Sequence, residues 1–129
     1  MHFAVGDYAM TEDAFAERLA RVRRRFVSTL EGKIDDAYES IAKRAGFVPD
    51  AASAVGETYR CMHGIVGVGP TVGFPATGRA AHDVEDALRA AQREGRGLRP
   101  DEILLLKKQL QVLREAANRE LRFFYSAAQ

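Results

Sequence analysis

The sequence has very little cysteine, and this limits the chemistry that it can carry. Cys61 is the single cysteine among 129 residues, so an intramolecular disulfide and a cysteine-rich zinc site are both excluded. The sequence also lacks a large excess of charge of one sign, because 19 basic and 18 acidic residues leave a formal net charge of +1. Proteins dedicated to nucleic acid usually have a clear cationic excess. The near balance argues against wholesale nucleic-acid binding.

Long apolar runs are missing as well. No stretch of the sequence approaches the roughly 20 apolar residues that a membrane-spanning helix needs. The first residues, Met1–Asp7, lack the basic start and the apolar core of a signal peptide. We therefore expect a cytoplasmic protein that does not bind a membrane.

The length and composition indicate one globular domain. Apolar residues make up 47% of the chain and charged residues 29%, which is ordinary for a folded protein. A chain of this size buries about two-thirds of the surface that its unfolded form exposes, and it has no room for a second core. We expect a single domain over residues 1–129 with its core at about 11–125.

Apolar residues recur at helical spacing in the first half of the chain. One helix is predicted from an N-cap at Thr11 to about Ala45, ahead of Gly46 and Pro49. Its apolar stripe contains Phe15, Leu19, Val22, Phe26, Leu30, Ile34 and Ile41. A second helix opens near Asp50. Its predicted core face contains Ala54, Thr58, Cys61, Ile65, Val68 and Val72.

The second half of the chain predicts two more helices. One starts at Phe74-Pro75 and ends near Arg93, with the stripe Phe74, Thr77, Ala81, Val84, Leu88 and Ala91. After a loop over residues 94–99, the other starts at Pro100 and has inside it Ile103, Leu106, Leu110, Leu113, Ala117, Leu121 and Phe124. No strand pattern competes, and short connections favour antiparallel neighbours. The predicted fold is all-α, an antiparallel up-down four-helix bundle.

His63 is the residue that stands out in the second helix. At about 100° per residue it lies roughly opposite the predicted core stripe, so its imidazole should face solvent, although an idle surface histidine also fits. Gly64 and Gly67 follow it, and each glycine inside a helix costs up to about 1 kcal/mol relative to alanine. Gly67 lies one turn after His63, where a missing side chain lets another protein approach.

An exposed imidazole is chemically suited to phosphoryl transfer. It is largely neutral near neutral pH, and its free nitrogen lone pair is a competent nucleophile toward phosphorus. The transfer depends mainly on positioning and on neutralising the moving charge, and a docked partner can supply both. The site therefore needs no pocket of its own.

The stretch His63-Gly64-Ile65-Val66-Gly67, continuing through residues 71–76 to Val84-Glu85, resembles the core of histidine-phosphotransfer (Hpt) domains. In that family the phosphorylated histidine is followed by a lysine and then a glycine. The resemblance implies that His63 accepts a phosphoryl group from a receiver-domain aspartate and passes it to another receiver. The docking face is then expected to include Gly67, Gly64, Arg60, Val66 and Tyr59.

The resemblance also implies the partners and the cofactor needs. The partners are receiver domains of response regulators or hybrid histidine kinases in a bacterial phosphorelay. The chain needs no metal, nucleotide or other cofactor, because the receiver supplies the aspartate and the magnesium. Such a domain is a phosphocarrier without independent turnover.

Val66 departs from the family pattern, because it stands where the family has its lysine. A surface charge of that kind contributes about 0.3 to 1 kcal/mol, so its absence is expected to slow transfer or to shorten the lifetime of the phosphohistidine without abolishing the chemistry. Arg60 lies one turn before His63, where it either replaces the missing charge or is an ordinary solvated residue.

Two other functions fit the sequence. In the first, a degenerate Hpt fold docks a receiver or kinase without being phosphorylated. In the second, a small helical bundle binds nucleic acid in a salt-dependent manner through Arg18, Arg21, Arg23, Arg24 and Arg25. His82 and Cys61 are interpreted as a surface or boundary histidine and as a buried small hydrophobe.

Overall fold

The protein folds into four long helices. The computed structural model describes the backbone of residues 5–127 and the side chains of residues 11–127, so the ends of the predicted 1–129 domain lie outside the described part. The elements in chain order are α1 (Val5–Glu39), the 3₁₀ turn η1 (Ile41–Arg44), α2 (Ala51–Val68), the 3₁₀ turn η2 (Pro70–Val72), α3 (Pro75–Glu94) and α4 (Pro100–Ala127). The predicted all-α class is confirmed, because helices make up 87% of the structure and residues 5–127 form no strand.

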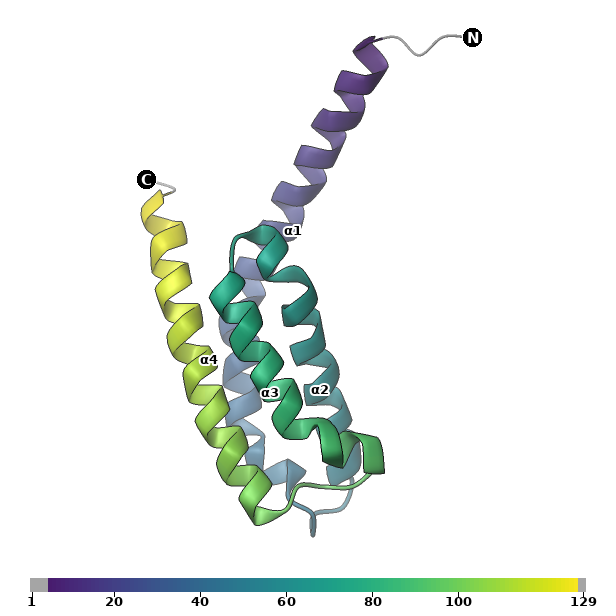
Figure 1. Cartoon of the computed structure of the whole chain (residues 1–129), viewed down its shortest axis with the longest axis vertical. Helices are drawn as coiled ribbons and strands as arrows, with labels where there is room; N and C mark the ends of the chain where they lie inside the picture. Colours follow the sequence, from purple (N-terminus) through teal and green to yellow (C-terminus); the bar gives the residue numbers. More distant parts are fainter. Residues whose placement is uncertain (1–4, 128–129) are drawn as a thin grey trace.

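The helices pack side by side, and successive helices run in opposite directions in Figure 1. The most extensive contacts join α2 to α3 and α3 to α4, and α4 also packs against α1. None of the helices in the described part of the chain is long and apolar enough to cross a membrane.

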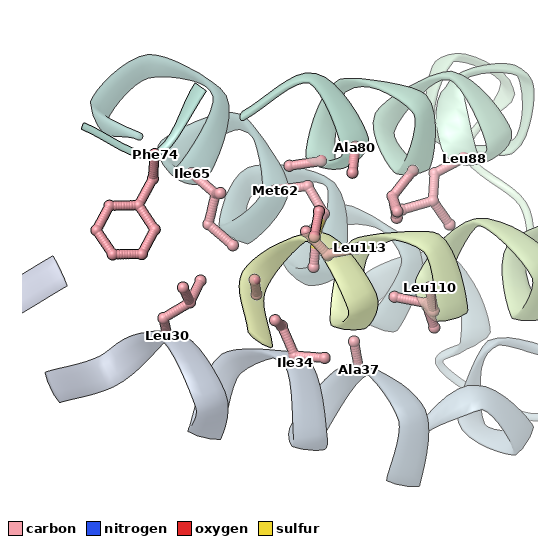
Figure 2. Close-up of a cluster of buried hydrophobic side chains, with 14 of the residues drawn as sticks. Leu30, Ile34, Ala37, Met62, Ile65, Phe74, Ala80, Leu88, Leu110 and Leu113 are labelled. Atoms are coloured by element: carbon pink, nitrogen blue, oxygen red, sulfur yellow. The ribbon is translucent and has the colours of Figure 1, made fainter. Parts of the chain in front are cut away.

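The core lies along the middle of the bundle (Figure 2). Leu30 and Ile34 of α1 face Met62 of α2 and Leu113 of α4, and all four side chains are almost fully buried. Burying a side chain of this size contributes roughly 1.5 to 3 kcal/mol. The predicted stripe of α3 is confirmed, since every one of its residues is buried: Phe74, Thr77, Ala81, Val84, Leu88 and Ala91.

The buried face of α2 differs from the predicted one. Val55 and Met62 are fully buried. Three residues predicted for the core are only half-buried: Ala54, Cys61 and Val68. Apolar side chains flank the buried stripe on both sides, so the spacing in the sequence does not show which of them face the core. The packing of α3 against α2 determines which face is buried. The face is turned by roughly 60° toward His63, which moves this histidine from the far side of the helix to the α2–α3 boundary.

The first helix ends before its predicted boundary at Ala45. After Glu39 the chain tightens into η1, and this places the side chain of Arg44 inside the bundle. There its guanidinium donates hydrogen bonds to the hydroxyl of Thr58, at 2.8 Å, and to the carbonyl of Ala37. That carbonyl belongs to the last turns of α1, where helical carbonyls lack partners and a cation is favourable. Burial lowers the pKa of Arg44 to about 10.

The start of the first helix was also predicted wrongly. Thr11 is not its N-cap, because α1 already begins at Val5. Figure 1 shows this N-terminal part of α1 projecting beyond the other helices. Phe15 and Val22 of the predicted stripe are therefore exposed, and the buried part of the stripe starts at Phe26.

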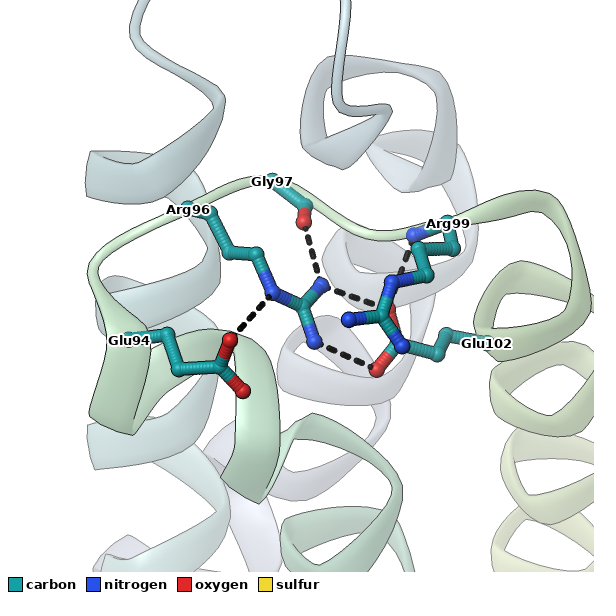
Figure 3. A network of polar contacts seen from close by, with 5 residues as sticks. All are labelled: Glu94, Arg96, Gly97, Arg99 and Glu102. Atoms are coloured by element: carbon teal, nitrogen blue, oxygen red, sulfur yellow. Dashed lines mark hydrogen bonds and ion pairs between the residues drawn. The ribbon is translucent and has the colours of Figure 1, made fainter.

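A polar network fixes the connection from α3 to α4 (Figure 3). Gly95 ends α3 with a positive φ of 65°, a conformation that favours glycine. Arg96 then donates two hydrogen bonds to Glu102, at 2.7 and 3.1 Å, and one to Glu94 at 3.3 Å. The backbone N–H of Arg99 donates to the same Glu102 at 2.8 Å. The hydrogen bond from Arg96 is the main reason that the pKa of Glu102 is lowered.

We expect Glu102→Gln to weaken the acid dependence of folding. A carboxylate with a lowered pKa in the folded state contributes its full stability above the usual glutamate value of 4.5, and this contribution is lost as the pH falls through the lowered pKa. Urea unfolding of the wild type should therefore lose stability from pH 5 downward by more than that of the variant. The exposed Glu31→Gln serves as control, and equal slopes for all three proteins would contradict the assignment.

Candidate functional site

His63 lies on α2 at the boundary with α3, with one edge of its ring exposed. Its side chain is 74% exposed, yet its Nδ1 lies 2.8 Å from Oε2 of Glu85, whose side chain is only 3% exposed. The pair therefore joins a solvent-facing imidazole to a carboxylate held inside the bundle. This contact is the central feature of the candidate site.

Glu85 reaches His63 because it lies on the buried face of α3. It comes four residues after Ala81 and three before Leu88, both of which are fully buried. A charge on this face is costly unless it has a hydrogen-bond partner, and the His63 ring provides one. No role for Glu85 was predicted from the sequence. The sequence does contain a feature that could have identified it, because Glu85 is an acidic residue in a stripe of otherwise apolar and small residues.

The carboxylate determines which nitrogen of His63 is free. An ionised carboxylate only accepts hydrogen bonds, so the Nδ1–H of His63 is the donor to Glu85. The neutral imidazole then has its lone pair on Nε2, the nitrogen away from the contact. The arrangement holds the ring in one orientation and leaves a nucleophilic nitrogen free for a partner.

The surroundings of His63 leave room for a partner. Tyr59 lies one turn earlier on α2 with its ring nearly parallel to the imidazole, at 8° and 6.5 Å between centroids. Gly64 and Gly67 are exposed, and a Cβ added to either would meet nothing within 4 Å. No contact inside the protein therefore requires glycine at these two positions. Because glycine has no side chain, nothing protrudes from these two positions beside His63.

The charges around the site come from arginines. Val66 is half-buried against the core and contributes no charge, whereas Arg60 is exposed. On α3, Arg89 and Arg93 line a polar hollow together with Tyr59, the residue that stacks on His63. Arg89 is paired with Asp86 at 2.8 Å, so its charge is balanced within α3, whereas Arg60 and Arg93 are exposed.

The turn between α2 and α3 sets the register of the His63–Glu85 contact. Gly69 is buried there, and a Cβ on it would lie 2.8 Å from the carbonyl oxygen of Ile65. The carboxylate of Glu120 on α4 accepts hydrogen bonds from the backbone N–H groups of Ala76 and Thr77, at 3.1 and 2.7 Å. These contacts satisfy free donors in the first turn of α3 and tie that end of the helix to α4.

The other sequence candidates lie outside this constellation. His82 is exposed and faces Asp86 at 3.6 Å, in agreement with its interpretation as a surface residue. Cys61 is half-buried, and burial raises the pKa of its thiol, which makes it a poor nucleophile. Among residues 11–127, one group gathers three potential metal ligands within 4.8 Å, and it does not include His63: His82, Asp83 and Asp86.

The arginine run of α1 is not one uniform surface. Arg23 is half-buried, and its Nε donates a hydrogen bond of 3.0 Å to the carbonyl of Val72 in η2. The remaining arginines of the run are exposed: Arg18, Arg21, Arg24 and Arg25.

The fold and the site define an all-α domain that presents one exposed histidine supported by a buried carboxylate. A family model described as Hpt domain matches residues 21–116, and the chain belongs to this family. Hpt domains act in phosphotransfer within two-component systems, where receiver domains and histidine kinases are their partners. Neither the curated proteins nor the solved structures gave a match to the chain.

The tautomer of His63 can be tested directly by NMR. We expect the ¹⁵N shifts of the neutral ring to show a proton on Nδ1 and a lone pair on Nε2, because Glu85 accepts only from Nδ1. Glu85→Met fills the same space without an acceptor, and it should return His63 to a mixture of tautomers. His82 in the same spectra is the internal control. A wild-type His63 protonated on Nε2 would disprove the orientation.

Proposed function

We propose that the chain is a phosphocarrier in which His63 is the phosphoacceptor on an antiparallel up-down Hpt bundle. It takes a phosphoryl group from the aspartate of a receiver domain and passes it to the aspartate of another receiver. The observation that carries the proposal is the 2.8 Å contact between the exposed His63 and the buried Glu85. This contact leaves Nε2 free and provides a negative charge on the opposite side of the ring.

The transfer follows from this geometry. Nε2 of His63 attacks the phosphorus of the aspartyl phosphate, an N–P bond forms, and the bond between phosphorus and the aspartate oxygen breaks. The aspartate leaves as a carboxylate, and no proton has to leave Nε2. The ring becomes cationic while Nδ1 keeps its proton, so the Glu85 carboxylate stabilises the charge that develops. Return of the phosphoryl group to a receiver is the reverse of these steps.

The open surface supports the assignment of a protein as the partner. Gly64 and Gly67 keep the surface around His63 low, while Tyr59, Arg60 and Val66 complete the proposed docking face. The exposed Arg60 and Arg93 suit the acidic rim of a receiver's phosphorylation site. The magnesium ion would be bound by the receiver, so this chain needs no cofactor, and the cytoplasm is the proposed location.

We expect radiolabel to pass from a phosphorylated receiver to the wild type but not to His63→Gln. The label should be lost in acid and stable in base, as is typical of phosphohistidine. His82→Gln is the matched control, because it removes the exposed histidine of α3 and should still be labelled. Folding of each variant is checked by circular dichroism.

The same experiment separates the proposal from the docking alternative. If a broad panel of receivers binds the wild type but leaves no label on it, the domain is a docking module that is not phosphorylated. Labelling of His63→Gln to the wild-type level would show that another residue is the acceptor.

Val66→Lys should increase the rate of transfer. The variant restores the positive charge that the family pattern has three residues after the histidine. Stabilising the phosphate by about 0.3 to 1 kcal/mol corresponds to a rate increase of about two- to five-fold. Rapid-quench kinetics measure it, with Val112→Lys on the exposed surface of α4 as control. An unchanged rate would mean that a charge at this position does not limit transfer, and an equal increase in the control would mean that the effect does not depend on position 66.

A further inference from the structure

The N-terminal part of α1 has exposed apolar residues on the same side of the helix as the buried Phe26. Phe15 and Val22 are exposed there, and Leu19 between them is half-buried against the core. The core stripe of α1 thus continues past the end of the bundle, as Figure 1 shows for the helix itself. Phe15 is 62% exposed and Val22 is 43% exposed. We call residues 11–25 of α1 the arm.

The end of α4 has further exposed aromatic residues. Phe123 is 78% exposed and Tyr125 is 53% exposed, but they lie about 200° apart around the helix and do not form one surface. A largely apolar groove lies at the base of the arm, and its lining includes Arg23, Phe74, Phe123 and Phe124. The arm and the groove lie at the same end of the molecule, because Arg23 belongs to both.

The charges of the arm are divided into two blocks. Its first half has three exposed acidic residues: Glu12, Asp13 and Glu17. Its second half has four exposed arginines: Arg18, Arg21, Arg24 and Arg25. A helix of this kind is complementary to itself when two copies lie antiparallel, because each acidic block then faces the basic block of the other copy. A parallel pairing would place like charges together.

We propose that the arm pairs antiparallel with the arm of a second copy of this chain and forms a two-fold symmetric dimer. In this arrangement Phe15 of each copy lies beside Val22 of the other, and Glu12 and Asp13 lie beside Arg25 and Arg24. The start of each arm points to the base of the other, where the groove lies. Such an interface is isologous and closes on itself, so the assembly stops at two copies.

Exposed aromatic surface supplies part of the area that this assembly needs. An aromatic side chain buries about 150 to 250 Å², so Phe15 and Phe123 of two copies together offer roughly 560 Å² of aromatic surface at their observed exposure. That is about a third of what a standard interface buries. The charged flanks and the remaining apolar residues of the arm supply further area. The proposal does not depend on phosphorylation of His63.

Sedimentation velocity over micromolar to millimolar concentrations tests the proposal. The wild type should sediment as a dimer, and the double variant Phe15→Glu/Val22→Glu as a monomer with unchanged helix content. Leu104→Glu is the matched control, because Leu104 is 68% exposed but lies near the start of α4, and it should leave the dimer intact. A monomeric wild type at every concentration would overturn the proposal, and so would a dimer that survives the double variant.

Charge reversal tests the antiparallel pairing. Glu12→Arg/Asp13→Arg places basic residues at both ends of the arm, and Arg24→Glu/Arg25→Glu places acidic residues at both ends. Each variant alone should be monomeric at low salt, and an equal mixture should form a heterodimer. Dimerisation of either variant alone at wild-type strength would overturn the antiparallel arrangement. If the wild type is monomeric and Phe15→Glu/Val22→Glu loses transfer from a receiver, the arm binds the receiver and the dimer is rejected.

Discussion

The hydrogen bond between His63 and Glu85 depends on one constraint, the close packing of α2 against α3. Glu85 is acceptable inside the bundle only because an imidazole nitrogen lies within 2.8 Å of its carboxylate. The imidazole, in turn, keeps a single orientation only because that carboxylate cannot move away. The turn at Gly69 and the Glu120 contacts at the start of α3 hold the two helices in the required register. A shift of either helix by one residue would separate the pair.

This arrangement explains how a convex surface can present a reactive group. The nucleophilic nitrogen faces solvent, while the group that orients it lies beneath and is shielded from solvent. Gly64 and Gly67 add no bulk around it, and the exposed Arg60 lies one turn before His63 on α2. The remaining requirements of phosphoryl transfer, an aspartate and a magnesium ion, are those of the proposed partner. In the proposed transfer, the bundle provides the orientation of His63 and access to it.

The arm differs from the His63 site because its main feature is an apolar stripe that the bundle leaves exposed. Its stripe has the same spacing as the buried part of α1, but the other helices end before they can cover it. The apolar periodicity indicates which face of the helix favours burial, but it does not indicate which surface covers that face. The division of charge along residues 11–25 indicates a partner for this face. Two antiparallel copies place acidic residues beside basic ones, and a parallel pair places like charges together.

The sequence by itself determined the four helices and the exposure of His63, because helical spacing, Pro75 and Pro100, and the Gly-rich stretch are local signals. It also predicted the whole buried stripe of α3. The sequence did not determine the face of α2, where Cys61 and Met62 are both apolar and only the position of α3 selects Met62. The inward turn of Arg44 and the pairing of Glu85 with His63 were likewise decided by tertiary structure. Each joins residues distant in the chain, and spacing along one helix says nothing about which side chain of another helix will meet it.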